Sequence, residues 1–180
     1  IAAATVPEAE RGHATVVEIG AGTGALTAAL AARARVVAIE RDRDLVPILE
    51  RAFADAPDVR IVEADAKTAD FVALGGERFV LAGNLPYQLT GVLLERAAGL
   101  AGHLARAVFM VQREVAERLL APPSTKTYGA LTVFTRAAFE ITRLMNVAPG
   151  SFIPPPDVTS TVVVLVPPRE LYVQVTEAFA

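Results

Sequence analysis

The sequence predicts an α/β fold, with helices on both faces of a mostly parallel, seven-stranded sheet that an antiparallel strand closes. Two observations predict it. From residue 15 onward, short apolar runs alternate with segments of helical periodicity, which is typical of βα units. Near the end, two apolar runs flank proline- and glycine-rich turns, which predict a closing pair of strands.

The first five strands are expected at apolar runs rich in valine and isoleucine, residues that favour strands. These runs are residues 15–19, 35–39, 59–63, 79–82 and 107–111. Longer segments with a helical spacing of apolar residues separate or follow them. We therefore expect helices at residues 24–33, 42–54, 90–100 and 114–120.

The remaining elements lie after residue 120. Residues 122–126 contain two prolines and polar side chains and predict an exposed loop, which a helix over 128–139 follows. Residues 139–147 and 161–166 predict the closing strands, with turns at Pro149-Gly150 and at the prolines of 154–156 between them.

Length and composition bound the class of protein. The 180 residues suffice for one domain with a sizeable core, and 53% hydrophobic and 21% charged residues are typical of a folded chain. Without cysteine there is no disulfide, thiolate metal ligand or cysteine nucleophile. The two histidines, His13 and His103, are far apart in sequence, so we expect no metal. No apolar run spans a membrane and the first residues lack a basic leader, so we expect a soluble, cytoplasmic protein.

Charge is distributed unevenly. The formal net charge of −3 argues weakly against nucleic acid as a partner. Between residues 96 and 143, however, basic residues outnumber acidic ones by seven to three. This segment either forms a phosphate-facing surface or merely solvates helix faces. The seven basic residues are Arg96, Arg106, Arg113, Arg118, Lys126, Arg136 and Arg143.

A glycine-rich loop follows the first predicted strand, at Glu18 to Gly24. Its alternating glycines allow a tight turn and a close approach of backbone to ligand, and the helix after it offers unpaired N–H donors. The pattern indicates a nucleoside-containing ligand. As a dinucleotide fingerprint it has Ala25 where the stricter form has glycine.

Acidic residues follow the next two strands. Glu40 ends the second, about twenty residues after the loop begins, where a carboxylate can accept hydrogen bonds from ribose hydroxyls. Asp65 comes just after the third, where it can accept from an adenine amino group. Either acid alone could be an ordinary surface residue, but three successive strand ends that each supply a group compatible with a nucleoside favour a binding site.

The most informative segment is Asn84-Leu85-Pro86-Tyr87, after the fourth strand. The Asn84 oxygen and the Leu85 carbonyl can accept hydrogen bonds from a planar amine, while Pro86 shapes the turn and Tyr87 offers a ring for stacking. Such acceptors favour methyl transfer to an amino group conjugated with a ring. The alternative is an ordinary Asn-Pro-type turn.

With these segments, the chain resembles the ribosomal RNA adenine dimethyltransferases of the KsgA type, which share a fold with the Erm rRNA methyltransferases. The similarity runs in order through nearly the whole chain. Its segments are 18–27, Glu40, 65–66, 84–87, 111–116 (VQREVA), 126–131 (KTYGAL) and 152–160 (FIPPPDVTS). Gln88 and Leu89 stand where the family usually has Asn and Ile.

The resemblance implies a Rossmann-like methyltransferase fold, with S-adenosylmethionine as methyl donor and S-adenosylhomocysteine as product. The reaction it implies is dimethylation of N6 of adenines in small-subunit rRNA, by a monomer that acts in ribosome biogenesis. The catalytic residues it implies are Asn84, Leu85, Pro86, Tyr87 and Phe152, with Phe152 as the second wall of the base pocket. The cofactor residues it implies are Glu18, Gly20, Ala21, Gly22, Thr23, Gly24, Glu40, Arg41, Asp65, Ala66 and Asn84.

The resemblance also implies a domain organisation. Residues 1–168 would form the catalytic domain, without the Gln-Asn-Phe-Leu segment that closes over the cofactor in the family. Residues 169–180 would begin a C-terminal helical domain that is mostly absent here.

Other functions stay open from the sequence. An Erm-type enzyme acting on large-subunit rRNA is the nearest, and a release-factor glutamine methyltransferase would normally have proline at position 85. A nicotinamide-dependent oxidoreductase would use a similar glycine-rich loop. A non-catalytic binding module for ribosome assembly or transcription could retain the same fold.

Overall fold

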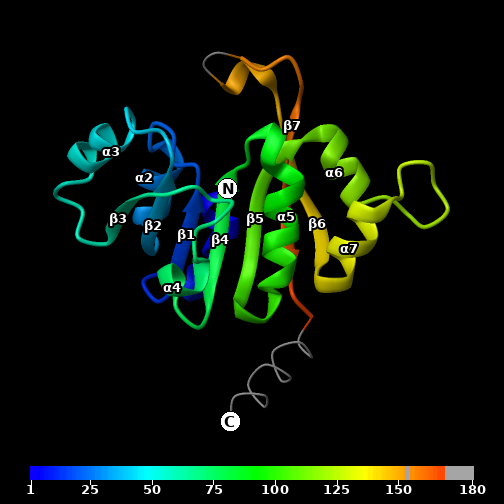
Figure 1. Ribbon diagram of the computed structural model, residues 1–180, viewed down its shortest axis with the longest axis horizontal. Helices are drawn as coiled ribbons and strands as arrows, with labels where there is room; N and C mark the ends of the chain where they lie inside the picture. Colours follow the sequence, from blue (N-terminus) through cyan, green and yellow to red (C-terminus); the bar gives the residue numbers. More distant parts are fainter. Residues whose placement is uncertain (153–154, 169–180) are drawn as a thin grey trace, which may run out of the picture.

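A seven-stranded sheet dominates the computed structural model, which describes residues 1–152 and 155–168 (Figure 1). The strand order is β3-β2-β1-β4-β5-β7-β6. Strands β1 to β5 are parallel, and β7 pairs antiparallel with both β5 and β6. The predicted fold class is therefore confirmed. The strands are β1 Thr15–Ile19, β2 Arg35–Glu40, β3 Val59–Glu63, β4 Phe79–Asn84, β5 Leu104–Gln112, β6 Glu140–Val147 and β7 Ser160–Val166.

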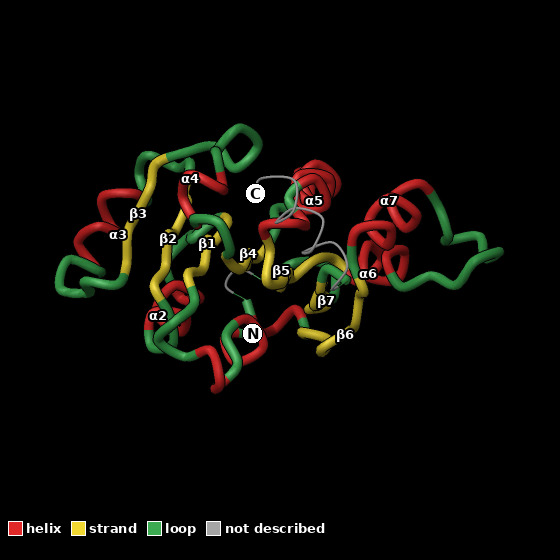
Figure 2. The backbone as a smooth tube through the Cα atoms, turned by 90° about the horizontal axis from the view of Figure 1, so that it is seen from below, coloured by secondary structure: helices red, strands yellow, loops and turns green. Residues whose placement is uncertain are grey.

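Helices cover both faces of the sheet (Figure 2). One face carries α1 Ala2–Thr5, α2 Ala25–Ala31 and α3 Val46–Ala52. The other carries α4 Phe71–Gly75, α5 Thr90–Gly99, α6 Arg113–Leu119 and α7 Ala130–Ala138. Short 3-10 turns complete the described elements: η1 Glu8–Glu10, η2 Tyr87–Leu89, η3 Ala101–His103 and η4 Pro149–Ser151. In the part of the chain that the structure describes, no helix has the length and apolar character needed to cross a bilayer.

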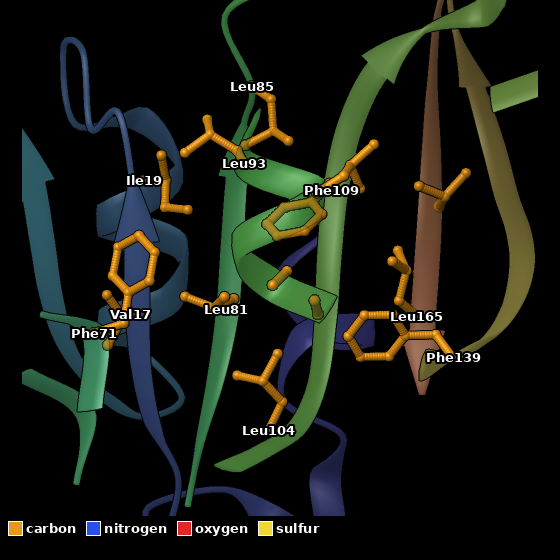
Figure 3. Packing of buried hydrophobic residues seen from close by; sticks show 14 of the residues in the cluster. Val17, Ile19, Phe71, Leu81, Leu85, Leu93, Leu104, Phe109, Phe139 and Leu165 are labelled. Carbon is orange, nitrogen blue, oxygen red and sulfur yellow. The ribbon is translucent and has the colours of Figure 1, made fainter. Parts of the chain in front are cut away.

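The core has two main layers because successive strand residues point to opposite faces. Val17 and Ile19 pack with Phe71, Leu93 and the helices on one side, as Figure 3 shows. Val16 belongs to the cluster on the other side, which includes residues of α2 and α3. Burial on both faces explains why the parallel strands appear in the sequence as continuous apolar runs.

The topology positions a crevice between β1 and β4. From β1 the chain crosses to β2 and then β3, and it returns to the opposite side of β1 to form β4. At such a reversal, the connections leaving the carboxyl ends of the two central strands diverge, which opens a ligand site there. Here those connections are the glycine-rich loop and the Asn84 turn.

The predicted helix over 42–54 begins later, at Val46. The side chain of Asp42 accepts a hydrogen bond from Asp44 N (2.9 Å), and its carbonyl accepts from Leu45 N and Val46 N. Residues 42–45 thus form a turn stabilised by an aspartate, which competes with helix in this way.

Two short helices, α1 and α4, are not predicted from the sequence. Helix α4 begins where Asp70 Oδ1 accepts from Val72 N and Ala73 N, at 3.1 and 3.0 Å. At five residues, it is too short to show a helical period. The predicted start of a C-terminal helical domain, at 169–180, and part of the 154–156 turn lie outside the described residues.

The contact between β1 and β4 predicts a strong effect of Gly83→Ala. Gly83 pairs with Ile19, and a Cβ atom at Gly83 would lie 2.6 Å from the Ile19 carbonyl oxygen. We expect the free energy of unfolding to fall by about 2 kcal/mol, measured by urea denaturation. Gly91→Ala in α5 is the control, because its Cβ meets nothing within 4 Å and should not destabilise. Equal stability of the two variants would contradict the prediction.

Candidate active site

A cavity of about 890 Å³ opens at the carboxyl ends of the parallel strands, within the size range typical of ligand sites. Seven predicted site residues line it: Gly20, Glu40, Arg41, Asp65, Ala66, Pro86 and Tyr87. The remaining lining residues are Ile19, Ile39, Asp42, Arg43, Ala64, Lys67, Gln88, Leu89 and Leu93. The structure therefore brings together groups from four separate strand ends.

The glycine-rich loop adopts backbone conformations that favour glycine. Gly20, Gly22 and Gly24 have φ angles of +70°, +57° and +84°, in the left-handed region where a Cβ atom causes strain. Gly24 is also crowded, since a Cβ there would lie 2.8 Å from the Phe53 ring. Ala21 is buried within this loop and Thr23 is exposed on it.

Glu40 connects this loop to the end of β2. Its Oε2 atom accepts a hydrogen bond from Gly22 N at 2.8 Å. Its Oε1 atom accepts from Arg41 N and Asp42 N, at 2.8 and 2.9 Å. A carboxylate has about four acceptor positions, so one position on Oε2 is left for a ligand hydroxyl.

Asp65 lies in a tight turn after β3. The Lys67 N–H donates to Asp65 Oδ1 at 2.8 Å, and Lys67 and Arg41 place positive groups 3.6 Å from Oδ2. The Lys67 backbone hydrogen bond, followed by the charges of Lys67 and Arg41, holds the pKa of Asp65 below its usual value. Asp65 is therefore ionised at neutral pH and acts as a hydrogen-bond acceptor.

The Asn84 turn extends directly from β4. Its exposed Asn84 ends the strand, and the buried Leu85 donates its N–H to the Met110 carbonyl at 3.0 Å. The Pro86 carbonyl accepts from Thr90 Oγ1 at 3.1 Å and from Leu89 N at 2.9 Å, which ties the turn to α5. Tyr87 is 42% exposed, so its ring is accessible for stacking.

Glu18 lies beneath the loop and is only 1% exposed. Within the described residues, its Oε2 atom and the hydroxyl of Thr27 have no hydrogen-bond partner of regular geometry. Burial raises the pKa of Glu18 to about 7; nearby Thr27 opposes the rise and the charge of Glu40 adds to it. Its predicted contact with a cofactor remains a prediction.

Phe152 is not among the residues that line this cavity. It packs against the small cluster of Val108, Met110 and Val162 on β5 and β7 and is half-buried. Figure 1 shows η4, which immediately precedes it, beyond the same end of the sheet as the loops of the site. Its role as a second wall for a target base stays a prediction, and residues 153–154 of its segment are not described.

The basic residues between 96 and 143 do not form one outward-facing surface. The Arg96 side chain donates to the carbonyls of Ala66 and Ala69, and Arg106 pairs with Glu10. Both arginines are half-buried and bound to other parts of the chain. The exposed basic residues of this set are Arg113, Arg118, Lys126, Arg136 and Arg143.

Sequence reasoning missed several lining residues. Asp42, Arg43 and Lys67 follow the predicted acids by at most three positions, so extending each strand-end segment would have included them. Leu93 has the ordinary spacing of a core residue in α5, and nothing in its local sequence distinguishes it.

Comparison with known proteins gives a consistent result. A family model described as ribosomal RNA adenine dimethylase matches residues 3–178. The chain is 46% identical to ribosomal RNA small subunit methyltransferase A of Geobacter metallireducens, over 84% of this chain and 57% of that protein. It is 44% identical to the protein of the same name from Synechococcus sp., over 93% of this chain and 61% of that protein. The chain thus spans a little over half the length of these relatives.

Two solved structures are also similar. A dimethyladenosine transferase from Plasmodium falciparum superposes with a TM-score of 0.81 and 30% identity, over 95% of this chain and 60% of that chain. The 23S rRNA methyltransferase ErmE superposes with a TM-score of 0.76 and 31% identity, over 88% of this chain and 63% of that chain.

The buried Glu18 carboxyl predicts a stability that depends on pH. Its pKa is about 7 in the folded chain against 4.5 ordinarily, so folding favours the protonated form. The contribution of Glu18 to the free energy of unfolding is complete below pH 4.5. It is lost as pH rises to about 7, because the buried carboxyl must then ionise in the folded chain. Glu18→Gln removes this titration. The variant should gain about 2–3 kcal/mol relative to the parent between about pH 5 and pH 8, measured by urea denaturation.

The exposed Glu50 offers a matched control for this measurement. Glu50→Gln should follow the parent's stability across the same pH range. A difference between Glu18→Gln and the parent that does not change with pH would contradict the prediction.

Proposed function

The chain belongs to the ribosomal RNA adenine dimethylase family, and we propose that it transfers methyl groups from S-adenosylmethionine to N6 of adenines in small-subunit rRNA. One observation carries the proposal: a single cavity is lined by Gly20 at the start of the glycine loop, by two acidic strand ends and by the turn that follows Asn84. The names of the relatives that match most of this chain support the small subunit as the target.

The cofactor half of the site fits an adenine nucleoside. Glu40 retains one acceptor position for a ribose hydroxyl, and Asp65 is an ionised acceptor for the adenine amino group. Gly20 brings backbone to the edge of the cavity without a side chain. These groups would hold S-adenosylmethionine, which supplies an electrophilic methyl group on a positively charged sulfur. Glu18, Ala21, Gly22, Thr23 and Gly24 would shape the loop around it.

The acceptor half lies at the Asn84 turn. Adenine N6 is a weak nucleophile because its lone pair is delocalised into the ring. Acceptors aimed at its hydrogens favour a more tetrahedral nitrogen, and we assign this role to the Asn84 side-chain oxygen and the Leu85 carbonyl. Tyr87, with Phe152 as a second wall, would stack on the base taken out of its helix. Once the methyl group is transferred, the nitrogen loses its proton readily, so a strong general base is unnecessary.

The proposal extends to the partner and setting. The exposed basic residues on α6, α7, β6 and the loop at 122–126 would provide phosphate-facing side chains for rRNA. An rRNA substrate is compatible with the cytoplasmic location expected from the sequence, and we propose a monomer as the active form.

Methyl transfer itself provides the direct test. Unmethylated small ribosomal subunits are incubated with the protein and labelled S-adenosylmethionine, and modified nucleotides are mapped. Large subunits are tested in parallel, because the similarity to ErmE makes an Erm-type target the main competitor. The full-length Geobacter relative provides a comparison. Dimethyladenine only in large subunits, or no methylation of adenine, would overturn the proposal.

Asn84→Ala should separate catalysis from cofactor binding. Removing the side-chain acceptor should lower kcat by about 10²–10³-fold. Binding of S-adenosylhomocysteine, measured by calorimetry, should change by less than about threefold, because Asn84 is not among the residues that line the cavity. A large loss of binding with unchanged kcat would contradict the assignment.

Asp65→Asn should change the choice of nucleoside base. The parent should prefer S-adenosylhomocysteine to S-inosylhomocysteine, whose ring presents an oxygen in place of the amino group. Asparagine can donate to that oxygen, so the preference should fall by about tenfold or more. Calorimetric titration with both compounds measures the ratio, and an unchanged ratio would exclude Asp65 as the adenine-reading residue.

A further inference from the structure

Arg96 connects two parts of the site that are distant in sequence. It lies on α5, and its Nη1 and Nη2 atoms donate to the carbonyls of Ala66 and Ala69, at 2.5 and 2.6 Å. Its guanidinium carbon lies 4.4 Å from the centre of the Phe71 ring, in a cation–π arrangement. One side chain thus contacts three residues of the segment that follows Asp65: Ala66, Ala69 and Phe71.

The segment after Asp65 forms a turn in which the backbone carbonyls have different hydrogen-bond partners. The Asp65 carbonyl accepts from Thr68 N and Ala69 N, both at 2.9 Å, which closes a compact turn. The Ala66 and Ala69 carbonyls are bound by Arg96 instead. The planar guanidinium presents donors in a fixed fork, which a single ammonium group cannot reproduce.

The other end of α5 holds the Asn84 turn. Thr90, the first residue of the helix, donates its hydroxyl to the Pro86 carbonyl at 3.1 Å. Between these two attachment points, Leu93 lines the cavity. Helix α5 therefore joins the turn after Asp65 to the turn after Asn84, with about 9 Å of rise between Thr90 and Arg96.

We infer that Arg96 is a positioning residue that holds the Asp65 turn in register with the Asn84 turn, and so sets the protein's selectivity for adenine in its cofactor. Arg96 does not line the cavity; it acts through the backbone that carries Asp65. The inference rests on the proposed function, since it assigns Asp65 to the adenine amino group.

The test compares Arg96→Met and Arg96→Lys with the parent protein. Methionine keeps an apolar stem over the Phe71 ring but removes both hydrogen bonds, and lysine restores at most part of them. The matched control is Arg33→Met, because the half-buried Arg33 also donates to a backbone carbonyl, that of Val6, and does not line the cavity. Calorimetry measures the affinity of each protein for S-adenosylhomocysteine and S-inosylhomocysteine.

We expect Arg96→Met to weaken S-adenosylhomocysteine binding about tenfold and the inosyl compound about twofold or less. The adenine preference therefore falls, and Arg96→Lys gives an intermediate value. In Arg96→Met, the KM for S-adenosylmethionine should change more than kcat, which is measured at saturating cofactor. Arg33→Met should keep the parent's ratio.

The ratio of the two affinities separates positioning from general stability, because a smaller folded fraction lowers both bindings equally. A parental ratio in Arg96→Met overturns the inference. If that variant does not fold, a parental ratio in Arg96→Lys overturns it instead, and a reduced one supports it. If the parent itself shows no preference for the adenine compound, the proposed function fails rather than the role of Arg96.

Discussion

The carboxylate of Glu40 is the interaction on which the arrangement of the site depends. It accepts three backbone N–H groups, one from Gly22 and two from the residues that follow β2. Two chain segments that leave neighbouring parallel strands are therefore held together by a single negative charge. Because hydrogen bonds to a charged acceptor are stronger than neutral ones, the loop has a defined shape before any ligand contributes.

Much of the scaffold could be predicted because its strands are buried on both faces. The bounds of β1 and β3 agree with prediction to the residue, since valine-rich runs there end at glycine or acidic residues. The start of α3 could not be predicted, because the outcome depends on whether the Asp42 side chain caps a turn. Helix α4 is five residues long and leaves no periodic signal.

The site was predictable to the extent that its groups follow strands directly. Glu40, Asp65 and the residues after Asn84 are adjacent in space because parallel strands end at the same edge of the sheet. Arg96 had no such signal. Its two carbonyl partners are 30 and 27 residues away, and a half-buried arginine in the last turn of a helix has the same local sequence as a solvated one.

The groups of the site fall into two consecutive segments of the chain, which recombination between related genes could exchange separately. Residues up to Asp65 and Ala66 supply the proposed donor half, and residues from Asn84 onward supply the proposed acceptor half. Recombination in the segment between them would combine the proposed donor half of one relative with the proposed acceptor half of another. Arg96 comes from the second part but binds the turn after Asp65. In a working chimera, the residue 96 supplied by one parent must therefore fit the turn supplied by the other parent.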